Sequence, residues 1–410
     1  MKKFFSALLC LLILCTPVTA HAEAAPEIVS ETAVVIDAGT GQVLYDKNMN
    51  RQMYPASITK VLTGLLAMEN CNLSDTVTVG ETAIEGIDGS VSYMALHPGE
   101  EISLEGLMYG LAIESANDAA NAIAEHISGS ISSFRDLMNS RAARAGAKNS
   151  HFENPNGLHS ENHYTTAYDM AMITRRRVRY DDFNKIFSTE KYSLGRTNLH
   201  EAREFNSANW FLNGALKYDG LVMSKTGWTE EALHTMVTCA ERNGVRLICV
   251  VMKSQNKKDK WDDTEKLLNW AFDSYTPVDV SGEFIALSAP EEISLGDGNL
   301  IVKKGDITCD GTRVLLTNRN DASGITVEFS RPQLSGDLQT AQMTASLYMG
   351  ETLLTTVNAI ATVSESGKEA VYVMPTAPVN KTADMVMAVI FGGLTFVAVM
   401  IVDILRGRRI

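Results

Sequence analysis

The sequence predicts an α+β fold, because segments with the pattern of strands come first and last and helical segments lie between them. Apolar residues alternate over 33–37 and 42–46, and Gly39-Thr40-Gly41 between them predicts a hairpin of two strands. Apolar strand patterns return at 221–226, 233–240 and 245–252. This order favours one antiparallel sheet with a helical insert over alternating β-α units.

The helices of the insert are predicted from their apolar period and their start signals. Pro55-Ala56 opens the first helix, because proline suits the first turn. Its apolar stripe consists of Ile58, Val61, Leu62, Leu65 and Leu66. Further helices are predicted over 104–113 behind a Ser103 cap and over 117–127, 133–145, 166–177 and 261–274.

The pattern changes again at Pro277. Between 284 and 373 short alternating stretches are separated by Gly-Asp, Asn-Asp and Ser-Gly turns, and no helix is predicted there. This pattern predicts a small all-β, sandwich-like domain over 283–374 that follows a larger domain over 27–276.

The beginning of the chain has the pattern of a cleaved secretory signal peptide. Residues 1–22 join Lys2-Lys3, a short apolar run and the small-residue site Ala20-His21-Ala22. The apolar run is too short to span a bilayer. We therefore expect the protein to be exported.

The other end of the chain has the pattern of a membrane anchor. Residues 385–402 contain no charge, and a helix of this length spans about 27 Å, close to the thickness of a hydrocarbon core. The basic tail 403–410 predicts a cytoplasmic end. We therefore expect a single-pass protein of the cytoplasmic membrane, with the bulk of the chain on the outer side.

Charge and cysteine content exclude several classes of partner. The formal net charge of −13 would repel nucleic acid. Beyond the predicted signal peptide the cysteines are Cys71, Cys239, Cys249 and Cys309. Their spacing fits no common metal-binding pattern, so no metal and no cofactor is predicted. Cys239 and Cys249 flank a hairpin turn at Asn243-Gly244 and should face opposite sides of the sheet, which argues against a disulfide.

A serine and a lysine three residues apart are the first candidates for chemistry. Ser57 and Lys60 fall on one face of the first predicted helix, where a lysine in a partly dry site can accept the serine proton. The same spacing occurs at Ser188-Lys191 and Ser254-Lys257. Only Ser57 stands at the start of a strongly amphipathic helix, which singles out the first pair.

Two further patterns accompany this pair. Ser115-Ala-Asn117 lies between two predicted helices, where both side chains could project together, although Ser115 could instead cap the second helix. Similar triplets occur by chance at 160–162 and 207–209. Lys225-Thr226-Gly227 ends an apolar strand, and its glycine would let a substrate backbone come close. The alternative for Lys225 is a surface lysine at a turn.

In this order and context, the three patterns resemble the penicillin-recognising serine enzymes. Glu114–Ala120, Asn154–Leu158, His163–Ala171 and Lys225–Thr229 are similar to low-molecular-mass penicillin-binding proteins that act as D-alanyl-D-alanine carboxypeptidases. The resemblance covers Ala33 to about Tyr275. It implies a transpeptidase/β-lactamase-like fold, and such enzymes often carry a β-rich domain and a C-terminal anchor.

The resemblance also implies the reaction. Ser57 would attack the carbonyl between the last two D-alanines of a peptidoglycan stem peptide, Lys60 would be the base for acylation, and Ser115 would relay protons. Water would then free the enzyme. β-Lactams such as penicillin would remain attached, because their acyl-enzyme hydrolyses slowly.

Substrate binding is implied for four more matched residues. Asn117 would hold the substrate amide, and Lys225 with Thr226 would bind the terminal carboxylate beside Gly227. Two departures from the family pattern, the longer run 220–224 before Lys225 and His234 after it, are expected to alter the start of the strand and the rim of the cleft.

Several alternatives remain open. A serine β-lactamase would need a deacylating glutamate, for which Glu201 and Glu204 are the candidates, although their surroundings lack the usual pattern. His159 and His163 could suggest a metallopeptidase, but a third ligand is missing. A D,D-endopeptidase and a non-catalytic wall-binding scaffold are the remaining possibilities. The sequence does not identify protein partners or the third residue of the stem peptide.

Overall fold

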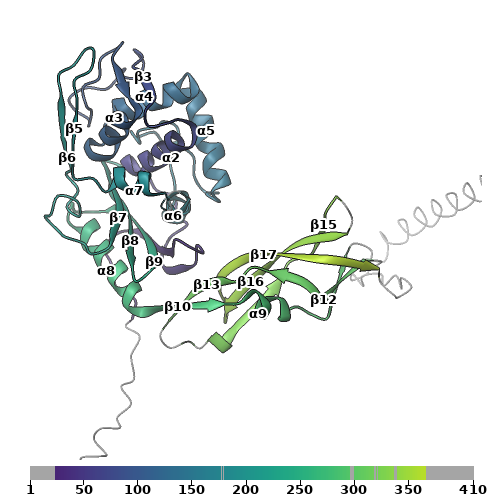
Figure 1. Ribbon diagram of the computed structural model, residues 1–410. Helices are drawn as coiled ribbons and strands as arrows, with labels where there is room; N and C mark the ends of the chain where they lie inside the picture. Colours follow the sequence, from purple (N-terminus) through teal and green to yellow (C-terminus); the bar gives the residue numbers. More distant parts are fainter. Residues whose placement is uncertain are drawn as a thin grey trace, which may run out of the picture.

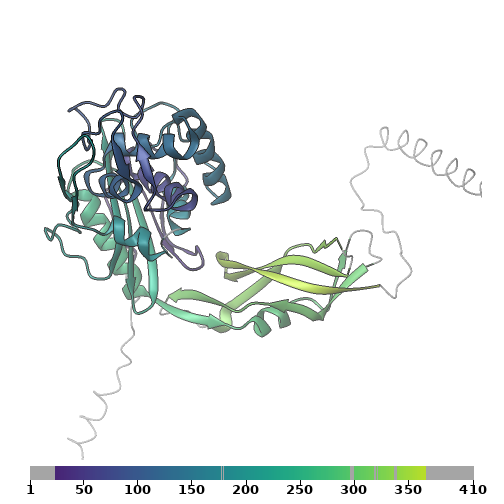
Figure 2. The same ribbon diagram turned by 45° about the horizontal axis from the view of Figure 1, so that its top comes forward.

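The computed structural model describes residues 24–365, apart from 177, 179, 296–299, 318–319, 321 and 337–338. These residues form a larger part and a β-rich part that extends sideways from its lower end (Figures 1 and 2). The predicted signal peptide 1–22, membrane helix 385–402 and tail 403–410 lie outside the described residues. No helix within the described residues combines the length and apolar character needed to cross a membrane.

An antiparallel five-stranded sheet lies at the centre of the larger part (Figure 1). Its strand order is β2-β1-β9-β8-β7. The strands are β1 Thr32–Asp37, β2 Val43–Lys47, β7 Leu221–Thr229, β8 Leu233–Arg242 and β9 Val245–Ser254. The first hairpin of the chain therefore pairs with the last three strands through β1 and β9, as the α+β prediction requires.

The two faces of this sheet enter different hydrophobic cores. Along β1, Val34 and Ile36 belong to one core, whereas the alternating Ala33 and Val35 belong to the other. This alternation explains why the predicted α+β sheet needs helices on both sides, because each face must be covered by apolar side chains.

The thiol groups confirm the predicted register of the β8–β9 hairpin. Cys239 lies opposite Ile248, and Cys239 and Cys249 enter different cores as free thiols. The turn residues Asn243 and Gly244 both have positive φ, 51° and 74°, as a two-residue hairpin turn demands.

Most helices lie on the face of the sheet that carries the larger core, and α8 covers the other face (Figure 1). They are η1 Ala56–Thr59, α2 Lys60–Asn70, α3 Leu104–Tyr109, η2 Gly110–Glu114, α4 Asn117–Ser128, α5 Ile131–Arg144, α6 Ala167–Arg175, α7 Asp181–Phe187 and α8 Asp259–Ser274. Two short ribbons complete the larger part: β3 Thr76–Thr78 with β4 Glu101–Ser103, and β5 Lys191–Leu194 with β6 Arg203–Asn206. The ribbons and α7 were not predicted, because three to seven residues are too few to establish a period.

The predicted helix over 104–113 is not uniform. Its Ser103 cap is confirmed, since Ser103 Oγ accepts a hydrogen bond of 3.1 Å from Gly106 N–H. The α-helical part ends at Tyr109, and a wider π-helical turn follows to Glu114. π-Turns of this kind are frequent at functional sites, and this one delivers the chain to Ser115.

The β-rich part is a six-stranded sheet with a separate ribbon made by β10 and β13. Its elements are β10 Tyr275–Val280, α9 Gly282–Leu287, β11 Glu292–Leu295, β12 Leu300–Cys309, β13 Thr312–Thr317, η3 Ala322–Gly324, β14 Ile325–Phe329, β15 Gln333–Leu334, β16 Thr340–Met349 and β17 Thr352–Glu365. The prediction of a region without helices is wrong at α9, whose six residues are too short to show a helical period.

Side-chain and main-chain hydrogen bonds join the two parts. The Gln42 amide donates to Leu315 O over 2.5 Å and accepts from Leu315 N–H over 2.8 Å. Tyr275 Oη donates to Leu44 O over 3.0 Å. Leu315 also packs into the core around α8, so β13 is attached to the larger part by both polar and apolar contacts.

Candidate active site

The turn η1 and the start of α2 place Ser57 directly beside Lys60. Lys60 Nζ donates hydrogen bonds to Ser57 Oγ (2.9 Å), Asn117 Oδ1 (2.7 Å) and Asn156 O (2.6 Å). The lysine is fully buried, and an ammonium group has three protons to donate. These three acceptors fix the amine next to the serine hydroxyl.

The environment of Lys60 favours its neutral form. Burial lowers the pKa of Lys60 well below its ordinary value, the positive charge of Lys225 lowers it further, and Asp118 opposes both. A neutral amine has a lone pair that can accept the Ser57 proton. Loss of the proton on the Ser57 side would keep the hydrogen bonds to Asn117 and Asn156 and turn a lone pair toward Ser57, which is the arrangement that serine activation needs.

A neighbouring loop supports the backbone before Ser57. Ala56 has a positive φ of 51°, which is unusual for a residue with a side chain. A Cβ atom at Gly157 would lie 2.0 Å from Ala56 O, so only glycine fits there. Thr63 Oγ1 donates to Pro155 O over 2.5 Å and ties the same loop to α2.

The π-turn and the start of α4 bring Ser115 and Asn117 to this pair. Ser115 has a left-handed backbone (φ 58°), and its Oγ accepts a hydrogen bond of 2.8 Å from Lys225 Nζ. The cap position of α4 is Ala116, without a side-chain cap, so Ser115 is not the helix cap considered as its alternative. Because Asn117 Oδ1 accepts from Lys60, its Nδ2 remains the donor for another partner.

Strand β7 carries the third group of predicted residues. Lys225 is only 3% exposed, and burial together with the charge of Lys260 lowers its pKa to about 7. Gly227 is required by close packing, because a Cβ there would lie 2.5 Å from Thr235 Oγ1 and 2.8 Å from Ser57 N. Lys225 is thus a buried lysine beside Ser57 and Lys60, not the surface lysine that its alternative described.

These residues surround a cleft of about 410 Å³. Ser57, Ser115, Lys225, Thr226 and Gly227 line it directly. Lys60 and Asn117 are buried and connect to it through the hydrogen bonds described above. A larger hollow of about 780 Å³ lies near the β10–β13 ribbon, but none of the predicted site residues lines it.

The cleft also contains residues that the sequence patterns did not select. Lys260 Nζ lies 3.2 Å from His234 Nδ1, and burial with the charge of Lys257 lowers the pKa of Lys260 to about 8. Asn209, part of a triplet attributed to chance, lines the cleft and accepts from Trp261 Nε1 over 3.3 Å. His234 was expected at the cleft, but no sequence pattern links Lys260 to Lys225.

The two departures from the family pattern have local structural effects. The longer run before Lys225 is accommodated by an irregular register between Leu221 and Met223. Gly220 has φ 77°, and a Cβ there would lie 2.2 Å from Glu241 O. His234 lies on the rim of the cleft, as expected.

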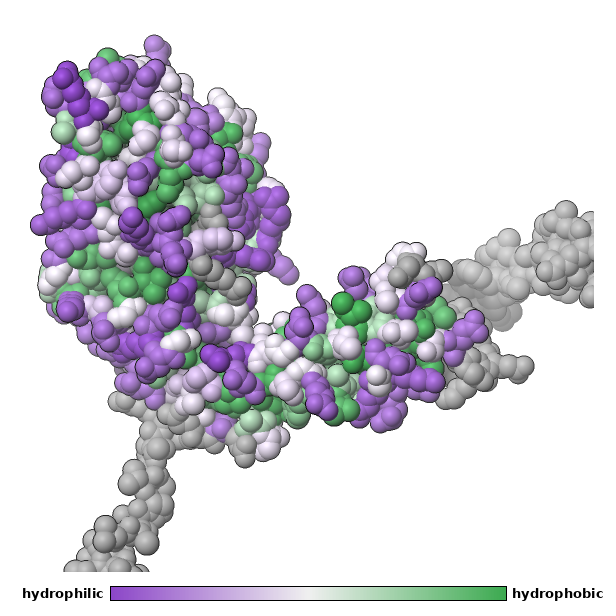
Figure 3. All heavy atoms as spheres, viewed as in Figure 1, coloured by the Kyte–Doolittle hydropathy of each residue, from purple (hydrophilic) through white to green (hydrophobic). Residues whose placement is uncertain are grey.

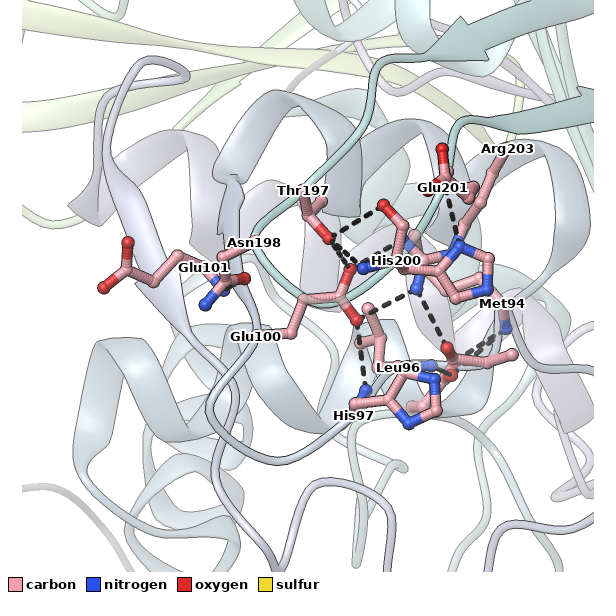
Figure 4. A network of polar contacts seen from close by, with 12 residues as sticks. Met94, Leu96, His97, Glu100, Glu101, Thr197, Asn198, His200, Glu201 and Arg203 are labelled. Carbon is pink, nitrogen blue, oxygen red and sulfur yellow. Dashed lines mark hydrogen bonds and ion pairs between the residues drawn. The ribbon is translucent and has the colours of Figure 1, made fainter.

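The glutamates considered for a β-lactamase do not line the cleft. Glu204 is exposed on β6 and accepts a hydrogen bond from Ser193 Oγ over 2.6 Å. Glu201 lies 3.5 Å from Arg196 with most of its side chain in solvent, at the edge of a polar network (Figure 4).

That network is built around a buried ion pair (Figure 4). Arg203 donates to both carboxylate oxygens of Glu100 over 2.6 and 2.9 Å, and Thr197 Oγ1 adds a bond of 2.8 Å. Burial raises the pKa of Glu100, but the bonds from Arg203 and Thr197 outweigh it and hold the pKa below its ordinary value. The pair fastens β6 to the loop that precedes β4.

The histidines considered for a metallopeptidase have other partners. His163 Nδ1 accepts from Glu153 N–H over 3.2 Å, so its Nε2 carries the proton donated to Thr59 Oγ1 over 2.9 Å. Burial lowers the pKa of His163 to about 3. Because both ring nitrogens are used, His163 is not available to a metal, and it instead supports the turn that carries Ser57.

The fold and the cleft have the arrangement that the resemblance to penicillin-recognising serine enzymes predicts, and the comparisons specify the family. Residues 19–256 match peptidase family S11, D-alanyl-D-alanine carboxypeptidase. The chain belongs to this family, since the match covers more than half of its length.

Individual relatives agree with this assignment. The chain is 38% identical over 253 residues to D-alanyl-D-alanine carboxypeptidase DacF of Bacillus subtilis, covering 60% of this chain and 63% of that protein. It is 30% identical over 339 residues to D-alanyl-D-alanine carboxypeptidase DacC of Escherichia coli, covering 79% and 80%. The chain thus spans under two thirds of the Bacillus relative's length.

A solved structure extends the similarity into the β-rich part. The crystal structure of penicillin binding protein 5 from Haemophilus influenzae matches with a TM-score of 0.65 and 26% identity. The match covers 84% of this chain and 100% of that chain. It therefore reaches beyond the larger part of the molecule.

Proposed function

We propose that the protein is a serine-type D-alanyl-D-alanine carboxypeptidase that removes the terminal D-alanine from peptidoglycan stem peptides. The observation that carries this proposal is the 2.9 Å contact between Ser57 Oγ and the fully buried Lys60 Nζ. Burial lowers the pKa of Lys60 well below its ordinary value, which makes Lys60 a better candidate base than an exposed lysine. Family membership and the names of the relatives support the substrate class.

The first half of the reaction forms an ester. Lys60 takes the Ser57 proton as Ser57 Oγ bonds to the carbonyl carbon between the two D-alanines. Backbone N–H groups at Ser57 and along β7 can stabilise the oxyanion, since Gly227 allows close approach to Ser57 N. The C–N bond then breaks as the proton taken up by Lys60 is returned to the leaving amine, with Ser115 as the relay.

The remaining residues orient the substrate. Asn117 Nδ2 donates to the substrate amide while its Oδ1 stays on Lys60. Lys225 in its charged form, helped by Thr226, binds the terminal carboxylate at the end of the cleft. Water cleaves the ester in the second half of the reaction and restores Ser57. A β-lactam also forms an ester with Ser57, as its ring opens. This ester blocks the site because it hydrolyses slowly.

The position of the glutamates favours a carboxypeptidase over a β-lactamase. Rapid hydrolysis of a penicillin ester needs a base aimed at the attacking water. Glu201 and Glu204 lie outside the cleft, with their carboxylates paired to Arg196 and Ser193. We therefore expect the penicillin adduct to be long-lived.

The proposed location follows from the terminal segments. We infer export through residues 1–22 and anchoring through 385–402, with the tail 403–410 in the cytoplasm. The domain limits 27–276 and 283–374 belong to the same proposal, in which the β-rich domain separates the active site from the membrane. Protease treatment of intact cells should cut the larger part and leave the tail protected.

The function is tested with a fluorescent penicillin. The wild-type chain should become labelled, Ser57→Ala should not, and the control Ser188→Ala, which changes another Ser-x-x-Lys pattern, should label normally. Absence of label on the wild type would contradict the acyl-enzyme. D-Alanine release from a pentapeptide would then establish the carboxypeptidase, whereas labelling without release would indicate an endopeptidase or a binding protein.

A further inference from the structure

Three ligand-type side chains meet at the ends of α2 and α4, away from the cleft. Cys71 follows the last residue of α2, Asp75 lies in the turn before β3, and His126 is in the last turns of α4. The Cys71 sulfur, an Asp75 carboxylate oxygen and a His126 ring nitrogen all lie within 4.8 Å of one another. We propose that these residues, named the Cys71 cluster, bind a divalent transition metal, with Zn²⁺ the best fit.

The kinds of ligand decide the kind of metal. A thiolate, an imidazole and a carboxylate suit Zn²⁺, whereas Ca²⁺ and Mg²⁺ prefer oxygen ligands. Zinc–ligand bonds of about 2.0–2.3 Å in a tetrahedron put neighbouring ligand atoms roughly 3.3–3.8 Å apart. The ligand atoms of the Cys71 cluster, at most 4.8 Å apart, therefore need side-chain movements of about 1 Å to reach these distances. Water would complete the tetrahedron.

The backbone already holds two of the ligands in place. Asp75 Oδ2 accepts a hydrogen bond of 2.8 Å from Asn72 N–H, which orients the carboxylate and leaves Oδ1 for a metal. Asp75 O accepts from Leu104 N–H over 2.8 Å, and Cys71 N–H donates to Ala67 O over 3.0 Å. The His126 side chain is exposed and can turn toward the other two.

The electrostatic surroundings favour a cation. The C-terminal ends of α2 and α4 both lie beside the cluster, and each helix carries partial negative charge at that end. Asp75 adds a full negative charge. The two helix ends and the Asp75 carboxylate thus contribute negative potential at the same place. A cysteine that only filled apolar space would need none of this negative potential.

Binding would exchange a proton for the metal. Burial and the charge of Asp75 raise the pKa of the Cys71 thiol, so the thiol is protonated at neutral pH in the metal-free protein. Zn²⁺ would form the Zn–S bond as the S–H bond breaks, and the proton would leave to solvent.

The location suggests a structural role. The helices α2 and α4 pack against each other, and their opposite ends carry Lys60 and Asn117. In Figure 1, α4 lies beside β3 at the upper end of the larger part. A metal at the Cys71 cluster would hold together the far ends of the two helices that supply the reactive lysine and its amide partner. It would raise stability without touching the substrate.

The test is a cobalt titration of the full-length chain after reduction and treatment with a chelator. Co²⁺ should bind at one equivalent and produce the sulfur-to-cobalt charge-transfer absorption that only a thiolate ligand gives. Cys71→Ser should abolish this absorption, and the control Cys309→Ser, which changes another half-buried thiol, should keep it. A saturating excess of Zn²⁺ should raise the Tm by roughly 2–8 °C in the wild type and not in Cys71→Ser.

A second variant separates loss of the site from loss of the fold. His126 is exposed, so His126→Ala should fold normally and bind Co²⁺ at least about tenfold more weakly. Absence of the absorption from the wild type at pH 8 would overturn the proposal. Unchanged absorption in Cys71→Ser would also overturn it. If Cys71→Ser does not fold, unchanged Co²⁺ affinity in His126→Ala would overturn it instead. Penicillin labelling is a separate readout, so its failure would not bear on the metal.

Discussion

The larger part and the β-rich part differ most in what they bury. The larger part encloses charged side chains, among them Lys60, Glu100, Arg203 and Lys225. Among the described residues after Ser274, Thr355 alone is a buried polar side chain. Hydrophobic side chains reach the surface of both parts (Figure 3), so exposed apolar area does not separate them. The buried charge does.

This difference shows in which part of the molecule the positions of polar atoms must be fixed. A buried polar group needs its partners in fixed positions, since an unpaired one is costly in a medium of low polarity. The hydrogen bonds that satisfy Lys60 therefore also define the distance to Ser57. The β-rich part has to fold, but its described residues include no comparable set of buried charged atoms to align.

The strongest test of this comparison removes the fully buried amine of Lys60. Lys60→Met should fill a similar volume but supply no base, so penicillin acylation should slow by about a thousandfold. The matched control in the β-rich part is the exposed Lys303→Met, which should acylate at the wild-type rate. Stopped-flow measurement of labelling provides both rates, and a loss of less than tenfold in Lys60→Met would contradict its role as base.

The second test breaks the ion pair in Figure 4. Arg203→Met leaves the fully buried Glu100 carboxylate without its charged partner, which should lower the free energy of unfolding by about 3–5 kcal/mol. The exposed pair Arg313–Asp279 in the β-rich part is the control, and Arg313→Met should leave the urea midpoint unchanged. Equal effects of the two variants would remove the distinction between the parts.

The third test separates the parts. Gln42→Leu leaves Leu315 N–H and C=O without their side-chain partner, which should lower the free energy of unfolding by about 1–3 kcal/mol. Calorimetry should then show two separate transitions, while the acylation rate stays at the wild-type value. The exposed Gln52→Leu is the control. A fall in acylation rate in Gln42→Leu alone would show that the junction supports the active site.

The smallest expected effect is a difference in pH dependence. The pKa values of Lys225 and Lys260 are lowered from 10.5 to about 7 and about 8. Between these values and 10.5 the unfolded chain binds more protons than the folded chain, so stability rises with pH. Calorimetry should show the Tm of the larger part rising by a few degrees from pH 7 to 8.5. Lys260→Met should reduce this rise, and an unchanged or falling Tm would be the contrary result.

The sheet and most helices could be predicted from the sequence for a physical reason. Strand and helix periods, the capping serine at Ser103 and the turn at Asn243-Gly244 are local signals that survive folding. The structure brings Ser57, Lys60 and Lys225 together around one cleft, although their catalytic roles stay predictions.

What the sequence could not provide depends on contacts between distant segments. Lys60 meets Asn156 O, and Lys260 enters the cleft beside His234, but the sequence spacing contains no trace of either contact. The helical period likewise runs past Tyr109 without indicating a π-turn. Three-dimensional packing decides such features, because the partner that stabilises them is far away in the chain.

The Gln42 junction also determines which edge of the central sheet is open. β2 and β7 are the edge strands, and an unpaired edge can recruit a strand from another chain and begin aggregation. At the β2 edge, Leu44 O is occupied by Tyr275, and the Gln42 amide covers the adjoining stretch with Leu315. The β7 edge borders the cleft. The edge beside Ser57 is therefore the more open one for an extended peptide, and under the proposed function a foreign strand there would compete with the substrate.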